Sequence, residues 1–210
     1  MESKVAGLDL PAAPSWERKP RRAALRSVAP SEFAGPPRRK RRGTNSPSPS
    51  EIAAAFEVLG AASVFYSMPD GILRSLARRL RTLRVPKGSL ITSQSETGDC
   101  IFFIAEGRCQ LAIERAAGHR VAVAVLAEGD FFGEAACVLS ETHQTSAVAL
   151  ADCRLFALDR TSLFAVISQS SAQIAQLSRL AQQRKATFAE TAAQASWGVL
   201  LGEAGYGIRL

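Results

Sequence analysis

One stretch of the chain, residues 128–153, combines a glycine, a carboxylate and a run of small residues. Gly133 and Glu134 are followed by residues 135–140, which are small or apolar and suit one or two helical turns. The first N–H groups of a helix lack partners within the helix, and the helix dipole makes that end attract anions. Because glycine also lets an anion approach the backbone closely, the pattern favours a cradle for a phosphate and a sugar.

Several short segments around this stretch alternate between apolar and polar residues, as β-strands do. Turn residues, many of them glycine, separate most of these segments. Short strands with regularly spaced turns are typical of a closed antiparallel barrel or jelly roll. The expected strands cover residues 82–85, 90–93, 100–105, 108–113, 121–126, 144–149 and 154–158.

Helical spacing of apolar residues flanks the strands on both sides. Between residues 51 and 80 the apolar residues recur at spacings of three and four residues, the period of a helix. Ser50 is the expected N-cap of a first helix, and Pro69-Asp70 is expected to open a second. Arginines 74, 78, 79 and 81 are expected on the solvent face of the second helix. After the strands, a short helix near Leu163 precedes a long one over residues 169–196.

The glycine pattern resembles that of a known family. The segments PKGSLI (86–91), TGDCIFFIAEG (97–107), AEGDF (127–131) and FGE (132–134) follow one another at barrel spacing. Over residues 61–180 the chain is similar to cyclic nucleotide-binding domains, above all those of the bacterial catabolite-activator/fumarate-nitrate regulator superfamily. The resemblance implies a jelly roll with the short helix inside it as the phosphate-binding cassette.

The resemblance also implies roles for individual residues. In the family, the carboxylate that matches Glu134 accepts a hydrogen bond from the ribose 2′-hydroxyl. Backbone N–H groups of Gly133, Ala135 and Ala136, directly after Phe132, would donate to the cyclic phosphate. The implied ligand is cyclic AMP or cyclic GMP, with no metal ion. A simpler interpretation of Glu134 is an acidic residue that only favours the helix dipole.

The chain departs from the family nine residues after Glu134. Most nucleotide-binding relatives carry an arginine there, whereas this chain has His143, followed by Gln144 and Thr145. Arginine is permanently charged and forks onto two phosphate oxygens, whereas histidine is only partly protonated near neutral pH. Losing one charge-assisted hydrogen bond costs about 1.5–3 kcal/mol, or about tenfold to hundredfold in affinity. His143 is therefore either a weaker phosphate ligand or an exposed loop residue, and the Thr145 hydroxyl stays available.

The long helix carries an apolar stripe with a near-heptad spacing. In the family such a helix pairs with its twin in a dimer or closes over the nucleotide, and the simplest alternative is packing on its own barrel. A homodimer would use residues 174–192. The stripe consists of Ile174, Leu177, Leu180, Ala181, Phe188 and Ala192.

The net charge of +7 lies entirely in the first fifty residues, which contain 11 Lys and Arg against 4 Asp and Glu. The remainder contains 15 of each and is neutral, so it carries no electrostatic footprint for DNA. Eight of the ten prolines also lie in residues 1–50, which we expect to be disordered. The basic block 36–42 would contact nucleic acid, an acidic membrane or the nuclear import machinery, or is a solvated tail that binds polyanions without specificity.

Other motifs are weak. The four cysteines form no C-x-x-C pair and are expected to be small core residues of a reducing compartment. The sequence shows no apolar run that would span a bilayer, no secretory signal and no catalytic motif. We therefore expect a cytoplasmic protein, or a nuclear one in a eukaryote, without enzymatic activity.

The sequence predicts an α+β chain. It has a disordered basic tail over residues 1–50, a jelly-roll domain with N-terminal helices over 51–168, a long helix over 169–196 and an irregular tail over 197–210. That last segment is too short for a winged helix-turn-helix. The predicted function is a cyclic nucleotide sensor module. The alternatives are a truncated transcription regulator with nucleic-acid contact through the basic tail, and a ligand-free scaffold that dimerises through the long helix.

Overall fold

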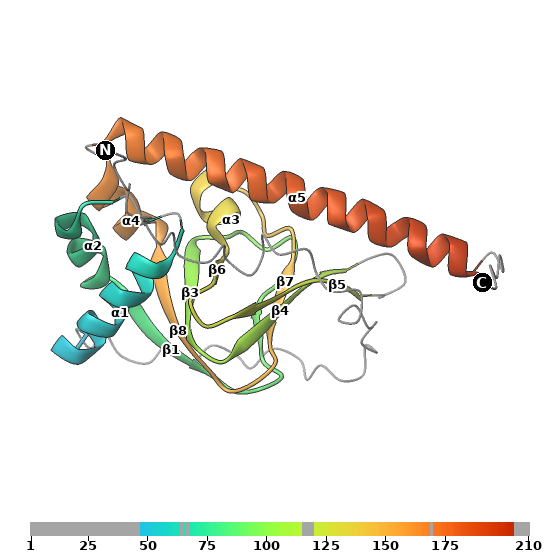
Figure 1. Cartoon of the computed structure of the whole chain (residues 1–210), viewed down its shortest axis with the longest axis horizontal. Helices are drawn as coiled ribbons and strands as arrows, with labels where there is room; N and C mark the ends of the chain where they lie inside the picture. Colours follow the sequence, from blue (N-terminus) through green and yellow to red (C-terminus); the bar gives the residue numbers. More distant parts are fainter. Residues whose placement is uncertain (1–46, 64, 66–67, 115–119, 169, 204–210) are drawn as a thin grey trace, which may run out of the picture.

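The computed structural model describes residues 47–63, 65, 68–114, 120–168 and 170–203. Two four-stranded antiparallel sheets face each other and form a jelly roll, which confirms the predicted fold class (Figure 1). The first sheet has the order β1 (Arg81–Val85), β8 (Cys153–Asp159), β3 (Cys100–Glu106), β6 (Phe131–Phe132). The second has the order β2 (Leu90–Thr92), β7 (Ser146–Ala149), β4 (Arg108–Glu114), β5 (Arg120–Ala127).

Helices cover the outer face of the first sheet. They are α1 (Pro49–Ala61), α2 (Asp70–Ala77) and α4 (Arg160–Ile167). The short helix α3 (Glu134–Leu139) follows β6. The long helix α5 (Ser171–Glu203) crosses over α3 and runs on past the barrel (Figure 1). The chain therefore places α3 between the barrel and its last helix.

Strand β3 is central because both of its faces are buried. Ile101 and Phe103 point toward the helices, whereas Phe102 and Ile104 point into the barrel, as the two-residue period of a strand requires. Phe103 is fully buried, and its ring centroid lies 5.6 Å from that of Phe65. Aromatic residues at these positions join the barrel and the helical layer into one packed unit.

Several predicted boundaries need correction. The first helix is capped by Ser48 rather than Ser50, because Ser48 and Glu51 form a reciprocal capping box. The strand expected from residue 144 begins at Ser146. The two-residue strand β6 was not predicted, since two residues show no alternation.

The ends of the chain also differ from the expectation. The described chain is already helical at Pro49, so the boundary at residue 51 falls inside α1. Helix α5 continues to Glu203, so the segment from Trp197 is helical where an irregular tail was expected. Its glycines weaken a helix by about 1 kcal/mol each, and it contains no proline to stop one. The basic block 36–42 lies outside the described residues.

We predict that Phe103→Ala lowers the free energy of unfolding by about 3–5 kcal/mol, because it leaves a cavity between the barrel and the helices. The exposed strand residue Val125, 39% exposed, is the control, and Val125→Ala should change stability by about 0.5 kcal/mol or less. Urea denaturation of both variants measures the difference. Equal midpoints for the two would contradict this account of the core.

Candidate ligand-binding site

Helix α3 begins at a glycine in a left-handed conformation. Gly133 is its N-cap with φ 85°, and a Cβ atom there would lie 2.7 Å from the carbonyl oxygen of Cys100. Both the conformation and the close approach therefore require glycine. The helix covers 134–139, one residue earlier than the sequence predicted, and Ser140 ends it in a second left-handed conformation.

The backbone amides at the start of α3 remain open. The amide of Cys137 donates to the carbonyl of Gly133, which is the first hydrogen bond of the helix. Among the described residues, no acceptor takes the N–H groups of Glu134, Ala135 and Ala136. These three donors are free to bind an anion, as the first turn of a helix allows.

A cavity of about 30 Å³ lies against these amides. The eight residues predicted from the sequence all line it: Phe132, Gly133, Glu134, Ala135, Ala136, His143, Gln144 and Thr145. Four further residues complete its wall, namely Leu111, Glu141, Thr142 and Phe188. The structure thus brings the predicted residues together, whereas their roles in binding stay predictions.

Glu134 is not free within this cavity. Its carboxylate lies 3.0 Å from the guanidinium of Arg184 on α5, and the two side chains are 3% and 1% exposed. Arg184 also donates from both terminal nitrogens to the carbonyl of Phe131 and lies over the Phe131 ring. A buried carboxylate needs such a cation, since an unpaired charge is very costly away from water.

Helix α5 closes one side of the cavity. Leu177 and Ala181 are fully buried, and two turns after Ala181 the Phe188 side chain lines the cavity wall. Lys185 adds a more exposed ion pair to Glu141 at 2.6 Å. From Leu177 to Phe188 the apolar stripe therefore packs on its own domain, and dimerisation through the helix stays a prediction.

The sequence analysis missed Arg184 and Phe188 as site residues. Arg184 lies three residues after Ala181 and four before Phe188, on the same helical face. An arginine within an apolar stripe is a signal for a buried ion pair, because such a side chain is rarely buried without a partner.

His143 lies in the loop between α3 and β7, and its ring is half-buried in the cradle. The backbone of this loop is held by two hydrogen bonds of 2.8 Å, from His143 N to Glu96 O and from Ser95 N to His143 O. Burial lowers the pKa of the imidazole, and the carboxylates of Glu96 and Asp99 oppose that change. The ring is therefore part of the site rather than an exposed loop residue.

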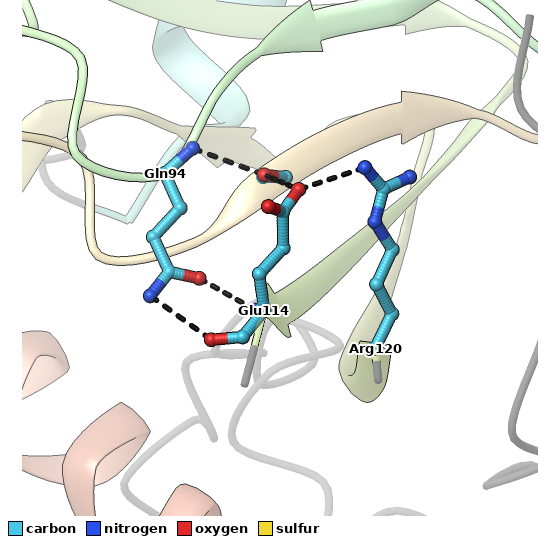
Figure 2. Close-up of polar contacts among 4 residues, drawn as sticks. Gln94, Glu114 and Arg120 are labelled. Atoms are coloured by element: carbon cyan, nitrogen blue, oxygen red, sulfur yellow. Dashed lines mark hydrogen bonds and ion pairs between the residues drawn. The ribbon is translucent and has the colours of Figure 1, made fainter. Parts of the chain in front are cut away.

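A polar network fixes the point where the His143 loop enters β7 (Figure 2). The side-chain amide of Gln94 pairs with the backbone of Glu114 at the end of β4, accepting from its N–H at 2.6 Å. The Glu114 carboxylate accepts from the Ser146 hydroxyl and forms an ion pair with Arg120. Since Ser146 starts β7 directly after Thr145, this network fixes one rim of the cavity.

The far end of α3 is held by Arg160, the first residue of α4. Its guanidinium donates to the carbonyls of Cys137 and Val138 and lies over the Phe164 ring. Cations at the C-terminal end of a helix satisfy carbonyls that have no helical partner. Arg160 therefore fixes the orientation in which α3 presents its first turn to the cavity.

Other reactive groups take no part in the site. All four thiols are buried and free, and burial raises the pKa of Cys100 to about 11 and that of Cys137 to about 12. In the part of the chain that the structure describes, no cluster of His, Cys, Asp and Glu could hold a metal ion. None of the described helices is both long and apolar enough to cross a bilayer.

Known proteins resemble this chain over the same region. A cyclic nucleotide-gated potassium channel of Rhizobium etli is 32% identical over 124 residues, covering 59% of this chain and 33% of the channel. A CRP-like cAMP-activated global transcriptional regulator of Mycobacterium tuberculosis is 23% identical, covering 61% of this chain and 57% of the regulator. The chain thus spans between a third and three fifths of the length of these relatives.

A solved structure shares the fold. The regulatory domain of Toxoplasma gondii PKA, crystallised with cAMP, superposes with a TM-score of 0.57 at 23% identity, covering 64% of this chain and 51% of that one. The family model that matches is the cyclic nucleotide-binding domain, over residues 82–170. Its span takes in the strands of the jelly roll from Thr82 onward, the cassette and the His143 loop, so the part of the chain that holds the candidate site is the part that matches this family.

Proposed function

We propose that this chain is a regulatory module that binds a cyclic nucleotide, cyclic AMP or cyclic GMP, and has no catalytic activity of its own. The observation that carries the proposal is the open first turn of α3 against a cavity lined by Glu134. Three free amides suit the cyclic phosphate, and a carboxylate beside them suits a ribose hydroxyl. A cytoplasmic location stays a prediction from the sequence.

The position of α5 would be the output of such a module. A cavity of about 30 Å³ is far smaller than the roughly 300 Å³ or more of a typical ligand pocket. Arg184 already pairs with the Glu134 carboxylate at 3.0 Å, and Phe188 lines the cavity. A bound nucleotide would therefore displace this part of α5 or share Glu134 with Arg184, and either event changes how the helix lies on the barrel.

A ligand-free scaffold is the second candidate. The small cavity and the engaged Glu134 carboxylate favour it, because the protein already satisfies the group that a ribose would need. In that case the buried pair would only fix α5 for contact with a partner. The two functions differ in whether folded protein takes up nucleotide, which the next experiment measures.

We predict that calorimetric titration of the full chain with cyclic AMP and with cyclic GMP shows saturable binding of at least one of them. Ala135→Asp should weaken this binding at least about tenfold, because it places a negative charge beside the phosphate amides. Ala53→Asp, the same change at an exposed position of α1, is the control and should bind like the wild type. Folded protein that gives no heat at millimolar nucleotide would favour the scaffold.

The buried ion pair makes a separate prediction about stability. Arg184→Ala should lower the free energy of unfolding by about 3–5 kcal/mol, because it leaves the Glu134 carboxylate buried without a cation. Arg179→Ala on the exposed face of α5 is the control and should cost less than about 1 kcal/mol. In a Glu134→Gln background the loss at Arg184 should shrink. Equal losses in both backgrounds, measured by urea denaturation, would show that the two side chains are not coupled.

A further inference from the structure

His143 lies where two glycines leave room for a ring. Its Cε1 and Nε2 atoms lie 2.9 and 3.0 Å from the place where a Cβ of Gly98 would be, and its Cε1 atom lies 3.6 Å from that of Gly133. Gly133 is the N-cap that precedes the free amides of α3. The imidazole edge is therefore part of the same concave surface as those amides.

The ring nitrogens are not committed to the protein. Within the described residues, neither of them takes part in a hydrogen bond, although two backbone hydrogen bonds fix the loop that carries the ring. The ring faces the cavity that holds the phosphate in the proposed function. It can therefore donate to an anion there without giving up an existing bond.

Charged groups from three elements surround this position. Glu96 and Asp99, in the loop before β3, favour the protonated ring, whereas burial in the cradle disfavours it. On α3, Glu134 is neutralised by Arg184 of α5. Glu141, in the loop after α3, is paired with Lys185, which also lies on α5. Without ligand the balance lowers the pKa of His143, so the ring is neutral at neutral pH.

We propose that the cradle takes up an anionic phosphate together with one proton on His143, so that nucleotide affinity rises as the pH falls. This inference rests on the proposed function and assigns to one residue the pH dependence of that binding. Arginine at this position would make the site independent of pH, whereas histidine couples ligand binding to protonation.

The direction of the effect follows from linkage. A neutral imidazole offers one N–H donor, whereas the protonated ring offers two donors and a positive charge. A bound anion therefore raises the pKa of His143 above its value in the free protein, and the complex binds a proton as it forms. Affinity changes by up to tenfold per pH unit between those two pKa values. A charge-assisted hydrogen bond sets the total gain at about tenfold to hundredfold.

The test is calorimetric titration of the full chain with cyclic AMP and cyclic GMP between about pH 5 and about pH 8, the range over which a histidine titrates. The cyclic phosphodiester keeps its single negative charge across this range, so a change in affinity reports on the protein. Three variants are compared with the wild type. His143→Gln keeps an N–H donor but does not titrate, His143→Arg carries a fixed charge, and His119→Gln removes the second of the two histidines.

The proposal expects about tenfold to hundredfold tighter binding at the acidic end for wild type and for His119→Gln. Affinity should be nearly constant with pH for His143→Gln, and constant and tighter for His143→Arg. NMR titration of the imidazole signals, with one histidine in each single variant for assignment, should show a higher His143 pKa with nucleotide than without. Circular dichroism at each pH establishes that all variants are folded.

Three contrary results are distinguishable. Binding that is equally pH-dependent in wild type and in His143→Gln overturns this inference and leaves the proposed function intact, and so does binding that is independent of pH in wild type. Folded protein that binds no nucleotide at any pH, in wild type and in His143→Arg alike, overturns both.

Discussion

The ion pair between Glu134 and Arg184 is the constraint on which the rest of the structure depends. Both side chains are almost completely buried, so neither charge is tolerable without the other. The pair joins the first residue of α3 to a helix fifty residues later in the chain. Whatever changes the surroundings of Glu134 must therefore also change the contacts of α5, so in the proposed function this pair would link the ligand site to the position of the helix.

The barrel gives this pair a rigid base. Strand β3 is buried on both faces, and Phe103 and Phe102 pack toward the helices and the barrel interior respectively. Strand β6 pairs with β3 and ends one residue before Gly133, so the start of α3 is set by the sheet itself. Arg160 holds the other end of α3 by donating hydrogen bonds to the carbonyls of Cys137 and Val138. The first turn thus has little freedom, and binding there costs little ordering entropy.

The site combines features of binding and of closure. Open amides and a half-buried imidazole suit an anion, whereas the Glu134 carboxylate is already paired with Arg184 and Phe188 lines a small cavity. These properties are compatible in a protein with two arrangements of one helix, because a ligand shifts such an equilibrium only through contacts that differ between the two. In the proposed function, histidine in place of arginine would weaken the fixed attraction for phosphate and make binding depend on protons.

Local patterns of sequence indicated the jelly roll and, through the resemblance to a known family, the cassette and eight of the twelve residues that line its cavity. Alternation along β3, glycines at turns and the run from Phe132 to Ala136 are short-range signals, and they report on backbone conformation directly. The two-residue strand β6 and the first residue of β7 have no such signals, so the sequence pattern did not reveal them. Only the tertiary structure showed that Arg184 neutralises Glu134, that Phe188 lines the cavity and that the His143 ring is part of the cavity wall rather than exposed. Those contacts join residues far apart in the chain, and a buried charge selects its partner by geometry, which no spacing rule encodes.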